Sequence, residues 1–250
     1  MVHTMSLVLA ASGIIFAACV KGAIGLGFPV IGIPIAAQFL DPQTAVVAIA
    51  IPGFLLNLIQ TLQQGIPTAI LWRFLPTIIF LVPGAIMGTA LLVRVPESML
   101  TLLLGLIVTL YAAVSIWRLR LVIPPSQERG VGAVVGLCGG LVGGATGIFS
   151  PPLAIYLTAL QLPKDTFVPA VSLCFLAGQI PQLLSFIGFQ LLTGPRLGMA
   201  TLFCALSAIG FLLGTRLQRA LSQEIFAKGV LAVLLLMGYN LLRSGLMGLR

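Results

Sequence analysis

Long apolar runs, separated by short stretches of glycine, proline and charge, are the main pattern along this chain. They divide it into ten segments, at residues 6–20, 24–40, 43–63, 68–93, 97–117, 131–145, 148–162, 166–190, 196–215 and 222–246. A helix needs about 20 apolar residues to cross the hydrocarbon core of a bilayer, and most segments approach this length. The pattern therefore predicts an all-α polytopic membrane protein.

Composition and charge agree with this class. Of the 250 residues, 59% are hydrophobic and only 7% are charged, whereas a soluble domain carries about a quarter charged residues. The net charge of +8 is best explained by basic residues at helix ends, beside anionic headgroups. We therefore expect a lipid bilayer and no nucleic acid as partner. The first segment lacks the basic residues that precede a signal peptide's apolar core, so we interpret it as a retained transmembrane helix.

The chain also contains an internal repeat. A charged linker, RLRLVIPPSQERG, divides it near the middle. An offset of 122 residues aligns 22–60 with 144–182, and eleven of these 39 pairs are identical, against about four expected by chance. We predict a first transmembrane repeat at 1–120, a charged linker at 121–130 and a second repeat at 131–250.

Each repeat holds five segments, which is an odd number. If all of them cross, the second repeat is inverted relative to the first, as in many transporters. With both termini outside, nine of the 13 basic residues then fall on cytoplasmic turns, in line with the positive-inside rule. Alternatively, the short second segment of each repeat is re-entrant, which leaves four crossings per repeat and balances the charges. We favour the inverted arrangement, with broken or re-entrant helices near the midplane.

Glycine and proline interrupt the apolar pattern at matched places in the two halves. The residues concerned are Gly22, Gly25, Gly27 and Pro29, and again Gly144, Gly147 and Pro151. Broken helices within a membrane occur where they are buried or line a watery cavity. A helix that begins there presents free N–H groups and a positive dipole end, which suits an anion. The alternative is close helix packing, which we assign to Gly84-x-x-x-Gly88 and Gly210-x-x-x-Gly214.

Polar side chains follow each break. Asn57 and Gln60 lie three residues apart on one helical face, and the repeat places Gln179 and Gln182 at the equivalent positions. Such amides point the same way and can donate hydrogen bonds without carrying charge. They either bind a ligand, which we favour, or link helices to one another. The hydroxyls of Thr146 and Ser150 are further candidate donors.

Lys21 borders the first break and is the best candidate for a cation that faces an anionic substrate. The competing interpretation is an interfacial lysine that reaches towards headgroups. We interpret Arg73 and Arg196, each at the start of the fourth segment of a repeat, as boundary markers.

Other kinds of site find little support. The sequence has no acidic residue in mid-segment, so no proton relay is evident, and it lacks the usual acid–base and nucleophile sets of an enzyme. The four cysteines lie in apolar runs without Cys-x-x-Cys spacing, so we expect no metal site and no cofactor. A membrane potential contributes about 2.3 kcal/mol per charge per 100 mV, enough to drive an anion out of a negative-inside cell.

Two segments, GAIGLGFPVIGIPIAAQFLDPQTAVVAIAIPGFLLNLIQ and GATGIFSPPLAIYLTALQLPKDTFVPAVSLCFLAGQIPQ, with the central charged linker, resemble the sulfite exporter TauE/SafE family of membrane transporters. The resemblance runs over nearly the whole chain. It implies a duplicated permease in the bacterial inner membrane and traffic in anions such as sulfite and sulfoacetate. The family's glycine/proline motif falls on the break residues named above, and its polar position on Asn57 and Gln179. The second copy departs from the motif at Phe149 and Ser150.

The leading hypothesis is thus a secondary transporter that exports a small sulfur-containing anion. A transporter of another small carboxylate is an alternative, because amide donors do not distinguish a sulfonate from a carboxylate. A membrane scaffold without transport is a third hypothesis, although matched breaks would serve no purpose in it. A homodimer is compatible with the sequence, but no feature argues for it.

Overall fold

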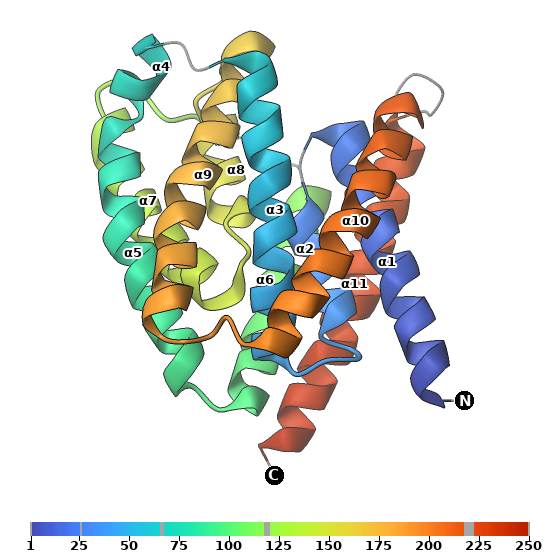
Figure 1. Cartoon of the computed structure of the whole chain (residues 1–250). Coiled ribbons are helices and arrows are strands. Elements are labelled where there is room, and N and C mark those ends of the chain that lie inside the picture. The colour runs from blue at the N-terminus through green and yellow to red at the C-terminus, as the bar shows by residue number, and fades with distance from the viewer. Residues whose placement is uncertain (1, 26, 66–67, 118–120, 218–222, 250) are drawn as a thin grey trace. The chain divides into compact units, whose positions relative to one another are not determined.

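The fold is helical throughout the described residues, which are 2–25, 27–65, 68–117, 121–217 and 223–249 of a computed structural model. Figure 1 shows the elements in chain order. Within the described residues these are α1 (Val2–Ile24), α2 (Phe28–Ala36), α3 (Pro42–Gln64), α4 (Thr68–Arg73), α5 (Leu75–Arg94), α6 (Glu97–Trp117), α7 (Glu128–Thr146), α8 (Ser150–Ala159), α9 (Lys164–Gly188), α10 (Gly194–Leu217) and α11 (Gln223–Gly248). The predicted all-α fold is confirmed.

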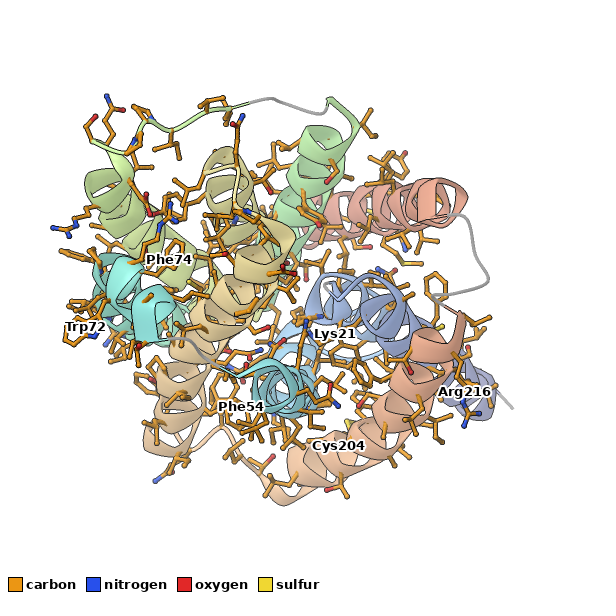
Figure 2. All side chains as sticks on the ribbon, turned by 90° about the horizontal axis from the view of Figure 1, so that it is seen from above. Lys21, Phe54, Trp72, Phe74, Cys204 and Arg216 are labelled. Carbon is orange, nitrogen blue, oxygen red and sulfur yellow. The ribbon has the colours of Figure 1, made fainter. Side chains whose placement is uncertain are left out.

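Seven of the described helices, α3, α5, α6, α7, α9, α10 and α11, are long and apolar enough to cross a membrane. The apolar part of α1, Val8–Ala23, is shorter. Large apolar side chains such as Leu62, Trp72 and Leu184 are more than 60% exposed, and Trp72 projects outward in Figure 2. Apolar surface on this scale is typical of a protein that contacts lipid. The chain is therefore a multi-pass membrane protein.

One predicted segment, 68–93, is wrong as a single helix. It forms α4 and α5, with a bend at Phe74 between them. Pro76 lies in the first turn of α5, where its missing N–H costs no hydrogen bond. In an uninterrupted helix its ring would clash with the carbonyl one turn earlier, so the helix restarts.

The described contacts form two compact units, and each takes helices from both halves of the sequence. Unit 1 comprises Met1–Pro52, Val95–Arg118 and Leu192–Arg250, and unit 2 comprises Gly53–Arg94 and Leu119–Leu191. The predicted division at 121–130 concerns the sequence repeat and stays a prediction.

In unit 1, α1 packs in parallel against α10, and α6 packs antiparallel to α11 (Figure 1). Gly210 lies on the carbonyl of Ile15, and Gly214 lies on that of Cys19. A side chain at either glycine would collide with the backbone of α1, so the glycines permit close packing.

In unit 2, α5 and α7 pack in parallel in the same manner. A Cβ atom at Gly84 would lie 3.0 Å from the Cα of Gly140, and one at Gly88 would lie 2.9 Å from the Cα of Gly144. These contacts support the packing role that we predicted for both glycine motifs, Gly84-x-x-x-Gly88 and Gly210-x-x-x-Gly214.

The short helices α2 and α8 have 9 and 10 residues. Each is about 15 Å long, roughly half the thickness of a hydrocarbon core. Eight residues of α2 are buried, from Phe28 to Ala36 with the exception of Pro29, and Leu153 and Tyr156 of α8 are at most 2% exposed. A helix that is apolar all round belongs inside a protein, and both short helices lie in the cores of their units.

The chain reverses direction between α7 and α8. The hydroxyl of Tyr156 donates to the carbonyl of Glu128 (3.1 Å), and the N–H of Ile123, just before α7, donates to the carbonyl of Ala159 (3.1 Å). The end of α8 therefore lies beside the start of α7. Helix α8 therefore runs antiparallel to α7, and whether it crosses the membrane or is re-entrant stays a prediction.

The direction of α6 and α11 bears on the inverted repeat. These are the fifth segments of the two halves, and an inverted repeat requires equivalent helices to run in opposite directions. Their glycine contacts, Gly105 with Leu242 and Gly245 with Leu102, make them antiparallel. Inversion stays a prediction, and this packing supports it.

Candidate functional site

The first break, in unit 1, is turned by two glycines. Gly25 and Gly27 have φ angles of 87° and 101°, in the left-handed region that glycine enters at little cost. The N–H of Gly25 bonds to the carbonyl of Lys21 (2.7 Å) and closes the last turn of α1. Gly27 is the N-cap of α2, and Pro29 lies in the first turn, where the sequence predicted it.

Gly22 does not face this turn. A Cβ atom there would collide with the carbonyl of Phe211 and lie 3.0 Å from the nitrogen of Thr215. In the second half, a Cβ at Gly144 would lie 2.9 Å from the nitrogen of Thr89. Neighbouring helices thus occupy the space beside both glycines, so the structure gives them a packing role, and ligand binding by them stays a prediction.

Lys21, labelled in Figure 2, lies in the last turn of α1 and is 2% exposed. An interfacial lysine would extend away from the protein, whereas this side chain is covered by it. A charged group inside a membrane protein is costly and is by default a functional candidate. Its burial favours the substrate-facing interpretation over the interfacial one.

The second break, in unit 2, has a similar backbone. Gly147, with a φ of 72°, is the C-cap of α7, and its N–H bonds to the carbonyl of Gly143 (2.6 Å). The hydroxyl of Thr146 donates to the carbonyl of Val142 (2.6 Å) and accepts from the N–H of Ile148 (3.3 Å). Thr146 therefore stabilises the break, and its hydroxyl proton is already used.

Helix α8 begins at Ser150, followed by Pro151 and Pro152. The two prolines carry no N–H, so this helix start offers fewer backbone donors than most. The hydroxyl of Ser150 is buried and has no hydrogen-bond partner among the described residues. A buried hydroxyl without a partner is unusual and requires an explanation.

Two amides meet beside the second break. The Nδ2 of Asn57 on α3 donates to the Oε1 of Gln179 on α9 (2.8 Å), and both residues are 2% exposed. They are the positions that the repeat equates, 122 residues apart. The structure thus brings together the two polar positions that the sequence singled out. Gln60, one turn after Asn57, is also buried.

Gln182 has a different task. Its Nε2 donates to the carbonyls of Gly143 (3.0 Å) and Gly144 (3.2 Å), at the end of α7. The side chain is fully buried, and its Oε1 has no partner within the described residues. Gln182 therefore caps the end of α7. Its remaining polar atom, Oε1, is a hydrogen-bond acceptor.

One residue of this region, Phe149, is not among the predicted site residues. The ring of Phe149 occupies the space beside two glycines, Gly143 on α7 and Gly178 on α9. It is 3% exposed. The available signal was its place in the repeat, where the equivalent residue is Gly27.

The two arginines that we interpreted as boundary markers bind differently. Arg73 forms a two-pronged ion pair with Glu128, with N–O distances of 2.5 and 2.9 Å. The hydrogen bond to this carboxylate raises the pKa of Arg73. Arg196 donates to the neutral oxygens of Thr44 (2.9 Å) and Gln43 (2.6 Å).

The model of one protein family, described as Sulfite exporter TauE/SafE, matches residues 9–241. Neither the curated proteins nor the solved structures include a match to the chain.

Proposed function

We propose, given that this chain belongs to the sulfite exporter TauE/SafE family, that it exports a small sulfur-containing anion such as sulfite, sulfoacetate or a related sulfonate. Membership makes the chain a membrane transporter of a family named for sulfite export. The identity of the anion, the direction of transport and the residues that bind the anion are our proposal.

The observation that carries the proposal is the buried amide pair of Asn57 and Gln179, beside a broken helix. Polar side chains are rare inside the membrane because burying them is costly, and they often mark substrate pathways. Each amide carries two N–H donors, and one N–H of Asn57 holds the pair together. Neutral donors can satisfy a sulfonate's oxygens and release the anion again, because no fixed counter-charge holds it.

Ser150 adds a hydroxyl at the start of α8, where the positive end of the helix dipole favours an anion. Its missing hydrogen-bond partner would be supplied by a substrate oxygen. We therefore assign Asn57, Gln179 and Ser150 to substrate binding in unit 2. In unit 1 we propose Lys21 as a cation that attracts the anion to the first break.

Transport of a carboxylate is the alternative within the same class, since these donors accept either group. A scaffold without transport is less well supported: the amide pair could link α3 to α9 in a scaffold as well, but two interrupted helices would serve no purpose there. Both alternatives predict no sulfite flux, so one assay separates them from the proposal.

The test is flux of radiolabelled sulfite and sulfoacetate from liposomes at imposed membrane potentials. The variants are Asn57→Ala and Gln179→Ala, with Gln63→Ala, an exposed amide on α3, as the matched control. We expect saturable flux that rises with potential and falls by at least about tenfold in the first two variants, since losing donors from a polar site has such effects. Normal flux in both variants would move the site elsewhere, and no flux in folded wild-type protein would reject the proposal.

A further inference from the structure

Phe149 is the aromatic residue at the second break, beside the buried Ile148, and the proposed function gives it no role. Its ring lies between α7 and α9, where both helices carry a glycine. A Cβ atom at Gly178 would lie 2.5 Å from ring carbon Cε1, and one at Gly143 would collide with the ring. The two glycines thus make the space that the ring fills.

The position is an unusual one for an aromatic residue. Phe149 is the N-cap of α8, and its side chain makes no capping hydrogen bond. Serine, threonine, asparagine and aspartate are the usual N-caps because their side chains bond to the first free N–H groups. In α8 the second and third positions are Pro151 and Pro152, which have no N–H to bond. A polar side chain at position 149 would therefore gain little as a cap, and the position can carry an apolar ring.

The proposed donors are neighbours of the ring on α8 and on α9. Ser150, with its unpartnered buried hydroxyl, follows Phe149 directly. Gln179, which pairs with Asn57, directly follows the glycine on which the ring rests. On the same helix, Gln182 lies one turn after Gly178 and donates to the carbonyl of Gly143, the other glycine against the ring. The ring therefore lies along the face of α9 that carries Gln182 and, three residues before it, Gln179.

We propose that Phe149 determines substrate size: its ring limits the length of the organic part of the anion bound at the amide pair in unit 2. This inference rests on the proposed function. A sulfonate consists of a charged head, which the donors bind, and an organic group, which needs apolar space. With the ring in place, the site selects sulfite and short sulfonates and excludes longer ones.

The repeat suggests the variant that tests this proposal. The equivalent of Phe149 in the first half is Gly27, and Phe149 has a φ of −82°, which any residue can adopt. Phe149→Ala is therefore compatible with the backbone. Because Gly143 and Gly178 have no side chains to fill the vacated volume, the space between α7 and α9 at these glycines stays open.

The experiment measures liposome flux of sulfite and of linear alkanesulfonates from methanesulfonate to hexanesulfonate. It compares wild type, Phe149→Ala and Phe74→Ala. Phe74 is an equally buried ring of unit 2 that contacts Tyr156 near the other end of α8. We expect Phe149→Ala to raise the hexanesulfonate-to-sulfite ratio of kcat/KM by at least about tenfold, the effect of one to a few methylenes in an apolar pocket. Phe74→Ala should leave the ratio unchanged.

The outcomes separate the two proposals. If wild type carries sulfite and Phe149→Ala leaves the ratio unchanged, or Phe74→Ala shifts it equally, Phe149 does not set substrate size although the transport function stands. If folded wild type carries none of these anions, both proposals fail. Folding of each variant is checked by a monodisperse gel-filtration peak. A second variant, Gly178→Ala, should displace the ring and lower the flux of all the anions without a gain for long ones.

Discussion

The two breaks have similar backbones and different contents. In each, a left-handed glycine ends one helix, Gly25 or Gly147, and a proline lies in the first turn of the short helix that follows. The first break carries Lys21 and Gly27, whereas the equivalent residues of the second are Gly143 and Phe149. One break thus pairs a buried cation with a glycine, and the other pairs a glycine with a buried ring.

This difference separates what the fold requires from what the substrate requires. The glycines that turn the chain and the glycines that face neighbouring helices recur in both halves, since the same geometry is built twice. Lys21 and Phe149 do not recur, since a glycine stands at the equivalent position of the other half in each case. We infer that the repeated residues maintain the breaks, and that Lys21 and Phe149 give each break its own chemistry.

The largest expected effect is a loss of stability when the packing glycines that recur in both halves are replaced. Gly22→Ala and Gly144→Ala each place a methyl group against neighbouring helix backbone, which cannot move aside as a side chain can. Overpacking of this kind costs about 3 kcal/mol, and we expect a marked loss of thermal stability in detergent for both variants.

The matched controls are Gly198→Ala on α10 and Gly130→Ala on α7, where nothing lies within 4 Å of the added atom. These should keep or slightly raise stability, because alanine favours the helix. If Gly22→Ala and Gly144→Ala melt like their controls, the two breaks are not held by glycine packing.

The next largest effect should be a loss of sulfite flux when the cation of the first break, Lys21, is removed. Lys21→Met keeps a long, unbranched side chain but removes the positive charge. Hydrogen bonds to charged groups contribute about 2 kcal/mol, so we expect sulfite flux to fall by about thirtyfold. Removing one member of a buried polar contact also destabilises a fold, so flux is compared at a temperature at which both proteins are folded.

The readouts are liposome flux and melting temperature, measured on the same preparation. Lys21→Arg keeps the charge and should retain part of the flux. Full activity in Lys21→Met would show that the first break does not recognise the anion through this residue, and the contrast between the breaks would lose its chemical basis.

The sequence was informative where glycine, proline and amides determine local structure. The segment ends lie close to the helix ends, because such breakers act locally. The shared positions of Asn57 and Gln179 in the repeat anticipated a pair that the structure shows bonded to one another. The break at Phe74 was missed, although Pro76 could have signalled it.

What the sequence could not provide is the direction in which a residue faces. Gly22 and Gly25 belong to one motif, yet the first packs against α10 and the second turns the chain. The repeat predicts equal donor roles for Gln179 and Gln182, but of these two Gln182 caps α7 and Gln179 pairs with Asn57. The ring of Phe149 was overlooked as a site residue for the same reason. Such roles depend on which helix lies opposite, which is a tertiary property.

A moderate effect is expected at the cap of the second break. Gln182→Leu keeps the volume but removes the Nε2 donor. The carbonyl of Gly143 then keeps the N–H of Gly147, whereas that of Gly144 keeps only the long contact from the Thr89 hydroxyl (3.5 Å). Buried groups without partners cost about 2 kcal/mol, so the melting temperature should fall clearly. Gln63→Leu, at an exposed position of α3, is the control. If both variants have the same melting temperature, Gln182 does not stabilise α7 as a cap.

The smallest effect should come from the arginines that distinguish the halves at their fourth segments. Arg73 pairs with a carboxylate, and the side chains of Arg73 and Glu128 are 42% and 12% exposed, whereas Arg196 donates to the neutral side chains of Thr44 and Gln43. Glu128→Gln should therefore destabilise by about 1 kcal/mol, because water can solvate the exposed Arg73 when its partner is neutral. That loss should shrink as salt rises, because salt screens exposed charges. Gln43→Leu removes an uncharged partner of Arg196, so its cost should not depend on salt. Melting temperatures at low and high ionic strength check both variants, and a salt-dependent loss in Gln43→Leu would contradict the distinction.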